Sequence, residues 1–99
     1  MLVHSVFFTL KDGLSEAEKA HFIEQVGTLG NIPTVDSIYI GTPAATPDRP
    51  VIRKDYDVAL TVLLKSLDDH DVYQEHQIHL DFIKNNSKFW ESVIIFDAD

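Results

Sequence analysis

Three side chains able to move a proton near neutral pH lie within two turns of one predicted helix. They are Tyr73, His76 and His79, in the run Tyr73-Gln-Glu-His-Gln-Ile-His79. A further imidazole, His4, lies on the first predicted strand. Imidazole gains and loses its proton near neutral pH and is the side chain that enzymes use most often as acid or base. The sequence therefore offers a candidate proton-transfer site at His79, Tyr73 and His4.

The same side chains also have a purely structural interpretation. A tyrosine and a histidine at a helix-sheet interface can fill space, each with one satisfied hydrogen bond. A lone histidine in an apolar row of a strand, as at His4, is more often a hydrogen-bonded core residue than a catalyst. His76 is expected on the solvent-exposed surface of its helix, and His21 and His70 are expected to be exposed.

Metal binding is a rival chemistry for the histidine pair. His76 and His79 are three residues apart and can share one helical face, and Glu75 or Asp81 would add an oxygen ligand. A tetrahedral site needs three or four convergent ligands, and this spacing supplies only two clearly. A haem would need a much larger cavity than so short a chain encloses. We therefore expect neither a metal nor a cofactor.

An apolar pocket is predicted beside the histidines. Aromatic residues are numerous, and most of them are expected in the core, but a gap among them would hold a small apolar or aromatic molecule. The residues predicted to line this pocket are Val6, Phe8, Phe22, Ile23, Val26, Phe82 and Trp90.

Length and composition exclude several classes of function. The 99 residues are expected to form one domain, residues 1–99, with a core of modest size. A net charge of −8 without a Lys/Arg cluster repels phosphate backbones, so nucleic acid is a poor candidate partner. There is no cysteine, which excludes disulfides and thiolate metal sites. No apolar run resembles a signal peptide or a membrane span, so we expect a cytoplasmic protein without membrane contact.

Two helices are predicted from their start and stop signals. The capping box Ser15-x-x-Glu18 begins the first, which runs to about Gly27 or Gly30 and stops before Pro33. Ser66 caps the second, which extends to residues 85–86 and is expected to break near Gln77.

Four strands complete the predicted fold. They cover residues 2–10, 37–40, 56–64 and 92–96, and in the third strand Tyr56, Val58, Leu60 and Val62 share one face. The order β-α-β-β-α-β is the ferredoxin-like α+β arrangement, a four-stranded antiparallel sheet with two helices on one face. The opposite face also carries apolar residues, among them Val3, Phe7, Ala59 and Leu63. A second copy of the chain is expected to cover it, which predicts a homodimer.

The chain resembles the stress-responsive A/B barrel (Dabb) domain family of the dimeric α/β-barrel superfamily over nearly its whole length. No single motif is specific, but the set in this order is. It comprises His4 near the start of the first strand, Ser15-x-x-Glu18, Asn31-Ile-Pro33, Gly41, Tyr56-Asp-Val-Ala-Leu60, Tyr73 with His76 and His79, Phe89-Trp90, and Val93-Ile-Ile-Phe-Asp97.

This resemblance implies a homodimer in which two sheets pack face to face as a barrel with the helices outside. The family includes plant stress-induced proteins and cyclases that close a linear polyketide thioester by aldol condensation. In these cyclases the histidine matching His79 is the general base, the tyrosine matching Tyr73 supports it, and the histidine matching His4 lies in the same pocket. The neutral imidazole would take a proton next to a carbonyl while Tyr73 donates to the developing enolate.

Two departures separate this chain from the cyclases. Val26 stands where they have a pocket tyrosine, and Gln77 replaces a proline common between the two histidines. The substrate class therefore does not transfer with the resemblance. Two functions follow: a dimer that binds a small apolar molecule, with polyketide-type cyclisation or related proton transfer, or a non-enzymatic stress-responsive homodimer with no small-molecule substrate. A cavity near His4, Tyr73 and His79 that is large enough for a drug-sized ligand would favour the first function, and side chains filling that space would favour the second.

Overall fold

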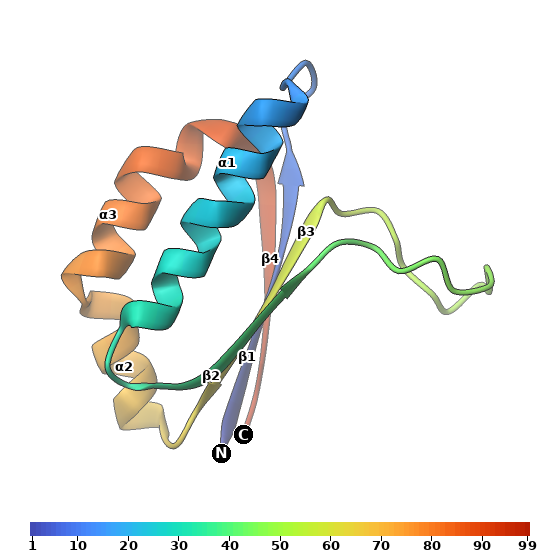
Figure 1. Ribbon diagram of the computed structural model, residues 1–99. Coiled ribbons are helices and arrows are strands. Elements are labelled where there is room, and N and C mark those ends of the chain that lie inside the picture. The colour runs from blue at the N-terminus through green and yellow to red at the C-terminus, as the bar shows by residue number, and fades with distance from the viewer.

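Four antiparallel strands form one sheet in the order β2-β3-β1-β4 in the structure, a computed structural model that describes residues 1–99. The helices lie along one face of this sheet (Figure 1). The elements are β1 (Leu2–Leu10), α1 (Glu16–Gly27), the 3-10 helix η1 (Thr28–Asn31), β2 (Val35–Gly41), β3 (Val58–Leu64), α2 (Leu67–Glu75), α3 (Gln77–Asn86), the 3-10 helix η2 (Ser87–Phe89) and β4 (Trp90–Ala98). The predicted ferredoxin-like α+β fold is confirmed.

Both helical segments begin at the predicted serines. In α1 the Ser15 hydroxyl accepts from the Glu18 backbone N–H at 3.1 Å, and the Glu18 carboxylate accepts from the Ser15 N–H at 3.0 Å. The Ser66 hydroxyl accepts from the Asp69 N–H at 3.1 Å at the start of α2. Each cap satisfies backbone donors that have no partner within the helix, so these local signals fix where the helices start.

The second helical segment breaks at His76, next to the predicted position. His76 has an extended backbone and separates α2 from α3. Its Nδ1 accepts a hydrogen bond from the Ile78 backbone N–H at 3.1 Å, so the imidazole caps the new helix. The ring is half-buried in this role, which corrects the expectation of an exposed surface histidine. Because Nδ1 is engaged, His76 is also a poor partner for His79 in a metal site.

Strand β3 starts two residues later than predicted, and this moves Tyr56 to the other face. The ladder between β1 and β3 ends at the pair Phe8 and Val58. Beyond it, the Asp57 carboxylate accepts from the Leu10 N–H at 2.7 Å, so a side chain replaces the next backbone bond. The alternation of the strand stops there, and the Tyr56 ring packs edge-to-face on Phe7 with centroids 5.1 Å apart. The prediction that Tyr56 shares a face with Val58 is therefore wrong.

Strand β4 is longer than predicted and contains an irregularity that sets its register. Thr9 pairs with Ser92 but Leu10 pairs with Trp90, so Glu91 is an extra residue. Such a bulge lets residues on either side of it keep to one face. Trp90 before the bulge and Val93, Ile95 and Asp97 beyond it therefore all lie on the helix-covered face of the sheet.

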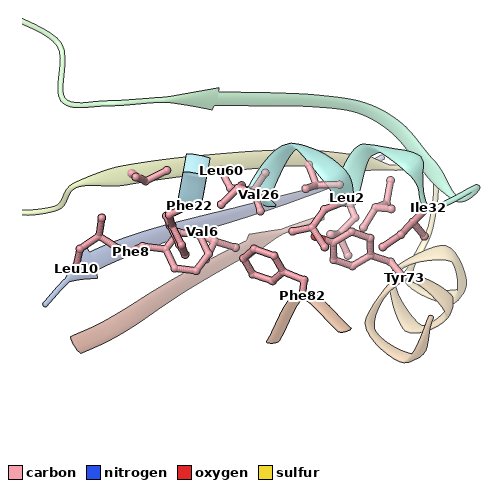
Figure 2. Close-up of a cluster of buried hydrophobic side chains, with 14 residues drawn as sticks. Leu2, Val6, Phe8, Leu10, Phe22, Val26, Ile32, Leu60, Tyr73 and Phe82 are labelled. Carbon is pink, nitrogen blue, oxygen red and sulfur yellow. The ribbon is translucent and has the colours of Figure 1, made fainter. Parts of the chain in front are cut away.

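The core fills the space between the sheet and the helices. Residues of β1 and β3 alternate between buried and half-buried along both strands. Phe8 meets Phe22 of α1 edge-to-face at 5.2 Å, and Phe82 of α3 stacks on Trp90 at 5.9 Å. Figure 2 shows this cluster, with Tyr73 reaching into it from α2. One continuous apolar layer thus joins the helices to the sheet.

The opposite face of the sheet is open in the single chain. Its apolar residues include Ile94 and Phe96 of β4, which are 53% and 64% exposed. Residues 42–57 leave the sheet between β2 and β3 and project away from the helices (Figure 1). None of the helices has the length and apolar character needed to cross a bilayer.

Candidate functional site

A cavity of about 130 Å³ lies between the sheet and the second helical segment. Strands β1, β3 and β4 supply its floor, and α2, α3 and η1 supply the rest. Its lining residues are His4, Val6, Phe8, Leu29, Leu60, Tyr73, Gln74, His79, Phe82, Ile83, Trp90, Val93 and Ile95. The three candidate proton-transfer residues therefore line one mostly apolar cavity.

Tyr73 contributes a buried hydroxyl group with no hydrogen-bond partner. Its side chain is fully buried, and its ring lies 5.0 Å from the ring of His79 and 5.7 Å from that of His4, both edge-to-face. Burial raises the pKa of Tyr73 far above its usual range, because the phenolate would lose its hydration. The hydroxyl thus stays protonated and can serve only as a neutral hydrogen-bond donor or acceptor.

His79 is buried on α3, and its Nδ1 also has no hydrogen-bond partner. Burial lowers the pKa of His79 below its ordinary value, and the positive charges that His4 and His70 carry when protonated lower it further. Both effects favour the neutral imidazole at physiological pH. A neutral imidazole has one nitrogen with a free lone pair, which is what a general base requires.

His4 is held by a carboxylate that the sequence analysis did not assign to the site. His4 on β1 pairs in register with Asp97 on β4, and the His4 Nδ1–H donates to Asp97 Oδ1 at 2.5 Å. The His4 side chain is 3% exposed and that of Asp97 is 44% exposed. Asp97 lay beyond the predicted end of the last strand. The alternation Val93, Ile95, Asp97 was the signal that would have placed it opposite Phe8, Val6 and His4.

His70 joins the same cluster, contrary to the prediction that it is exposed. Its ring lies 5.2 Å from that of His4, edge-to-face, and its side chain is half-buried. The cause is tertiary: α2 lies over the start of β1, so a residue in a strongly polar helical stretch faces the sheet. His21, in contrast, is exposed on α1, as expected.

The predicted apolar lining is divided between the cavity and the core. Val6, Phe8, Phe82 and Trp90 line the cavity. Phe22 and Val26 are fully buried in the core and Ile23 packs against it, and none of these three lines the cavity. The lining residues that the sequence analysis did not single out are Leu29, Leu60, Gln74, Ile83, Val93 and Ile95.

A larger hollow, of about 260 Å³, lies on the open face and contains no histidine. Phe7, Tyr56, Ile94 and Phe96 line it together with Thr9, Arg53 and Asp55. Arg53 donates two hydrogen bonds to the Asp55 carboxylate, so its charge is paired. This hollow has largely apolar walls, and its one carboxylate is held by Arg53.

Comparison with known proteins identifies relatives over the full length. A sequence model for the stress responsive A/B barrel domain matches residues 2–99. Olivetolic acid cyclase from Cannabis sativa is 27% identical over 95 residues, which cover 95% of this chain and 91% of the cyclase.

Two solved structures have the same fold. A hydroxynitrile lyase from Passiflora edulis superposes with a TM-score of 0.80 at 24% identity, covering 98% of this chain and 90% of the lyase. A dimeric protein of unknown function with a ferredoxin-like fold from Bacteroides fragilis gives a TM-score of 0.74 at 25% identity, covering 99% of this chain and 94% of that protein.

Proposed function

The chain belongs to the stress responsive A/B barrel domain family, and from this premise we propose that it binds a small apolar or aromatic carbonyl compound beside His79 and transfers a proton on it, as a homodimer. The reaction needs no cofactor. We place it in the class of polyketide-type cyclisation or related proton transfer by histidine, and the likeness to a cyclase supports the cyclisation.

The observation that carries this proposal is a pair of buried polar atoms without partners, which belong to two residues that line the cavity. The Tyr73 hydroxyl and His79 Nδ1 are both buried, and neither makes a hydrogen bond within the chain. Leaving a buried polar group unsatisfied costs about 1–3 kcal/mol, so proteins keep few such groups. Two of them on residues that line one apolar cavity favour a ligand that completes their hydrogen bonds. A purely packing role, as in a non-enzymatic homodimer, leaves this cost unexplained.

The chemistry follows from the protonation states of the two side chains. His79 removes a proton from the carbon next to the ligand carbonyl, and the electron pair of the broken C–H bond forms an enolate. The Tyr73 hydroxyl donates a hydrogen bond to the enolate oxygen, where negative charge develops. The enolate carbon then either attacks an acceptor carbonyl, whose π electrons move to its oxygen and take the proton from His79, or takes that proton back itself. His4, oriented by Asp97, lies at the same cavity and supplies a second imidazole.

The size of the cavity limits how much of the ligand can lie inside it. A volume of about 130 Å³ falls short of the drug-sized pocket that the sequence analysis set as support for a ligand-binding function, but the space is not filled by side chains either. It is close to the roughly 150 Å³ that accommodates benzene. Ile83 and Ile95 line the cavity and are themselves 42% and 50% exposed, so they mark its mouth. A compound with one ring or a short acyl group inside, and the remainder passing between these two residues, fits this shape.

The homodimer is supported by the open face of the sheet. Phe7, Tyr56 and Phe96 form an aromatic group there, with Phe7 5.1 Å from Tyr56 and 6.2 Å from Phe96. Large exposed apolar patches mark association surfaces. Two such faces packed together would cover the sheet on its free side and close the barrel that the family name describes.

Exchange of a carbon-bound proton tests the proposal without knowledge of the natural substrate. Acetophenone carries one ring and an adjacent ketone, and deuterium entry at its methyl group in D₂O can be followed by NMR. We expect the protein to accelerate this exchange, His79→Ala to abolish the acceleration, and Tyr73→Phe to reduce it less. His21→Ala, a change at an exposed histidine, is the matched control. No acceleration together with no shift of cavity resonances, for acetophenone and for short-chain ketones, would contradict the proposal.

A further inference from the structure

Three potential metal ligands from separate elements meet beside the cavity. His4 comes from β1, His70 from α2 and Asp97 from β4, and one ligand atom from each lies within 4.8 Å of the other two. These residues are far apart in the sequence, so no local motif brings them together. The pairing of β1 with β4 and the packing of α2 on β1 create the cluster.

We propose that His4, His70 and Asp97 bind a divalent first-row transition ion such as Zn²⁺. Two imidazoles and one carboxylate are a ligand set that zinc accepts with an open fourth position. Two imidazoles bound to one tetrahedral ion through nitrogens about 2.0–2.1 Å from it have ring centres roughly 5 Å apart. The ring centres of His4 and His70 are 5.2 Å apart, so the cluster has the spacing that the ion needs.

The adjustment required for binding is small and falls on the two more exposed members of the set, Asp97 and His70. In the free protein the His4 N–H donates to Asp97, and the two atoms are 2.5 Å apart, whereas ligand atoms around zinc are roughly 3.4 Å apart. Binding displaces the Nδ1 proton to solvent and lets the ion take its place between the two groups. Asp97 is 44% exposed, so its carboxylate is free to rotate.

His70 is free to turn toward the ion as well. Its nearest polar partners, Asp71 and Gln74, both lie 3.5 Å away, so neither holds the ring strongly. The buried His4 fixes the inner end of the site, while His70 and Asp97 leave it open to solvent. The net charge of −8 further favours the approach of a cation.

Zinc titration of metal-free protein, followed by calorimetry, tests this inference. We expect one ion per chain, and we expect both His70→Leu and Asp97→Asn to weaken binding by about tenfold or more. His21→Ala changes an exposed histidine outside the cluster and should bind zinc as the unchanged protein does. Co²⁺ gives a second readout, because tetrahedral coordination produces visible absorption that His70→Leu should remove.

Circular dichroism establishes that each variant is folded, and His70 is half-buried on a surface helix, so its replacement is tolerated. Absence of a one-to-one site in the unchanged protein, or equal binding by His70→Leu, would overturn the inference. Its outcome is separate from that of the proposed function, because the titration uses no organic ligand. His79→Ala removes the cavity base but should retain the zinc site.

Discussion

The two faces of the sheet carry similar apolar patterns but have different surroundings. Phe7 and Phe8 are neighbours on β1: Phe8 is buried beneath the helices, whereas Phe7 lies on the open face with Tyr56 and Phe96. The covered face also holds every group of the candidate site, among them His4 and His79. Alternation in a strand therefore indicates two apolar surfaces, but the helices decide which of them becomes a core with a cavity and which remains available to a partner.

The largest expected effect comes from shortening Phe8 on the covered face. Phe8→Ala removes a ring from the core beside Phe22 and Trp90, and such changes cost about 3–5 kcal/mol of unfolding free energy. Phe7→Ala is the matched change on the open face and should mainly weaken association. Sedimentation velocity and chemical denaturation at one protein concentration separate the two, because sedimentation measures association and denaturation measures unfolding. Equal losses by both measurements for the two variants would remove the distinction between the faces.

A charge on the open face should have the next largest effect. Phe96→Glu places a carboxylate on a residue that is 64% exposed in the single chain and central to the proposed interface. We expect association at least about a hundredfold weaker, or roughly 3 kcal/mol, because the charge would lose its hydration in the dimer. Sedimentation velocity measures this. Val72→Glu, at an exposed apolar residue of α2, is the control and should leave the dimer intact.

Local signals explain what the sequence could predict, and tertiary contacts explain what it could not. The caps at Ser15 and Ser66 depend on residues within three positions of each other, so the sequence specifies them directly. The face of Tyr56 was mispredicted because the Asp57 carboxylate takes the place of a ladder bond, and this depends on where Leu10 lies.

The cluster around His4 shows more clearly that contacts made by tertiary packing cannot be predicted from neighbouring residues. Asp97 meets His4 only through the β1–β4 register and its bulge, and His70 meets it only because α2 packs on β1. Neither contact has a signature in the neighbouring sequence. His79 and Tyr73 were identifiable because they lie on one helical segment and matched a family pattern, but their catalytic roles remain predictions.

A smaller effect is expected for the Tyr73 hydroxyl, and it separates stability from function on the covered face. This hydroxyl is buried without a partner, so Tyr73→Phe should leave the unfolding free energy unchanged or raise it by up to about 1 kcal/mol. The same change should slow the ketone exchange by about tenfold or more, because the donor to the enolate oxygen is lost. Thermal melts and the exchange assay on one preparation measure both. A clear loss of stability would mean that the hydroxyl has a structural partner.

The smallest expected effect is the pH dependence that His79, on the covered face, gives to the unfolding free energy. Burial lowers the pKa of His79 in the folded chain, whereas in the unfolded chain it returns to about 6.5. Between these two values the unfolded state binds more protons, so the unfolding free energy should fall as the pH drops below about 7 and level off below the folded pKa. Urea denaturation between pH 5 and 8, in buffer with a chelator, measures the slope. His79→Gln should flatten the slope, while His21→Ala, at an exposed histidine, should preserve it. An unchanged slope in His79→Gln would mean that this imidazole is hydrated in the folded protein, and the covered face would then lack the dry base on which the proposed chemistry depends.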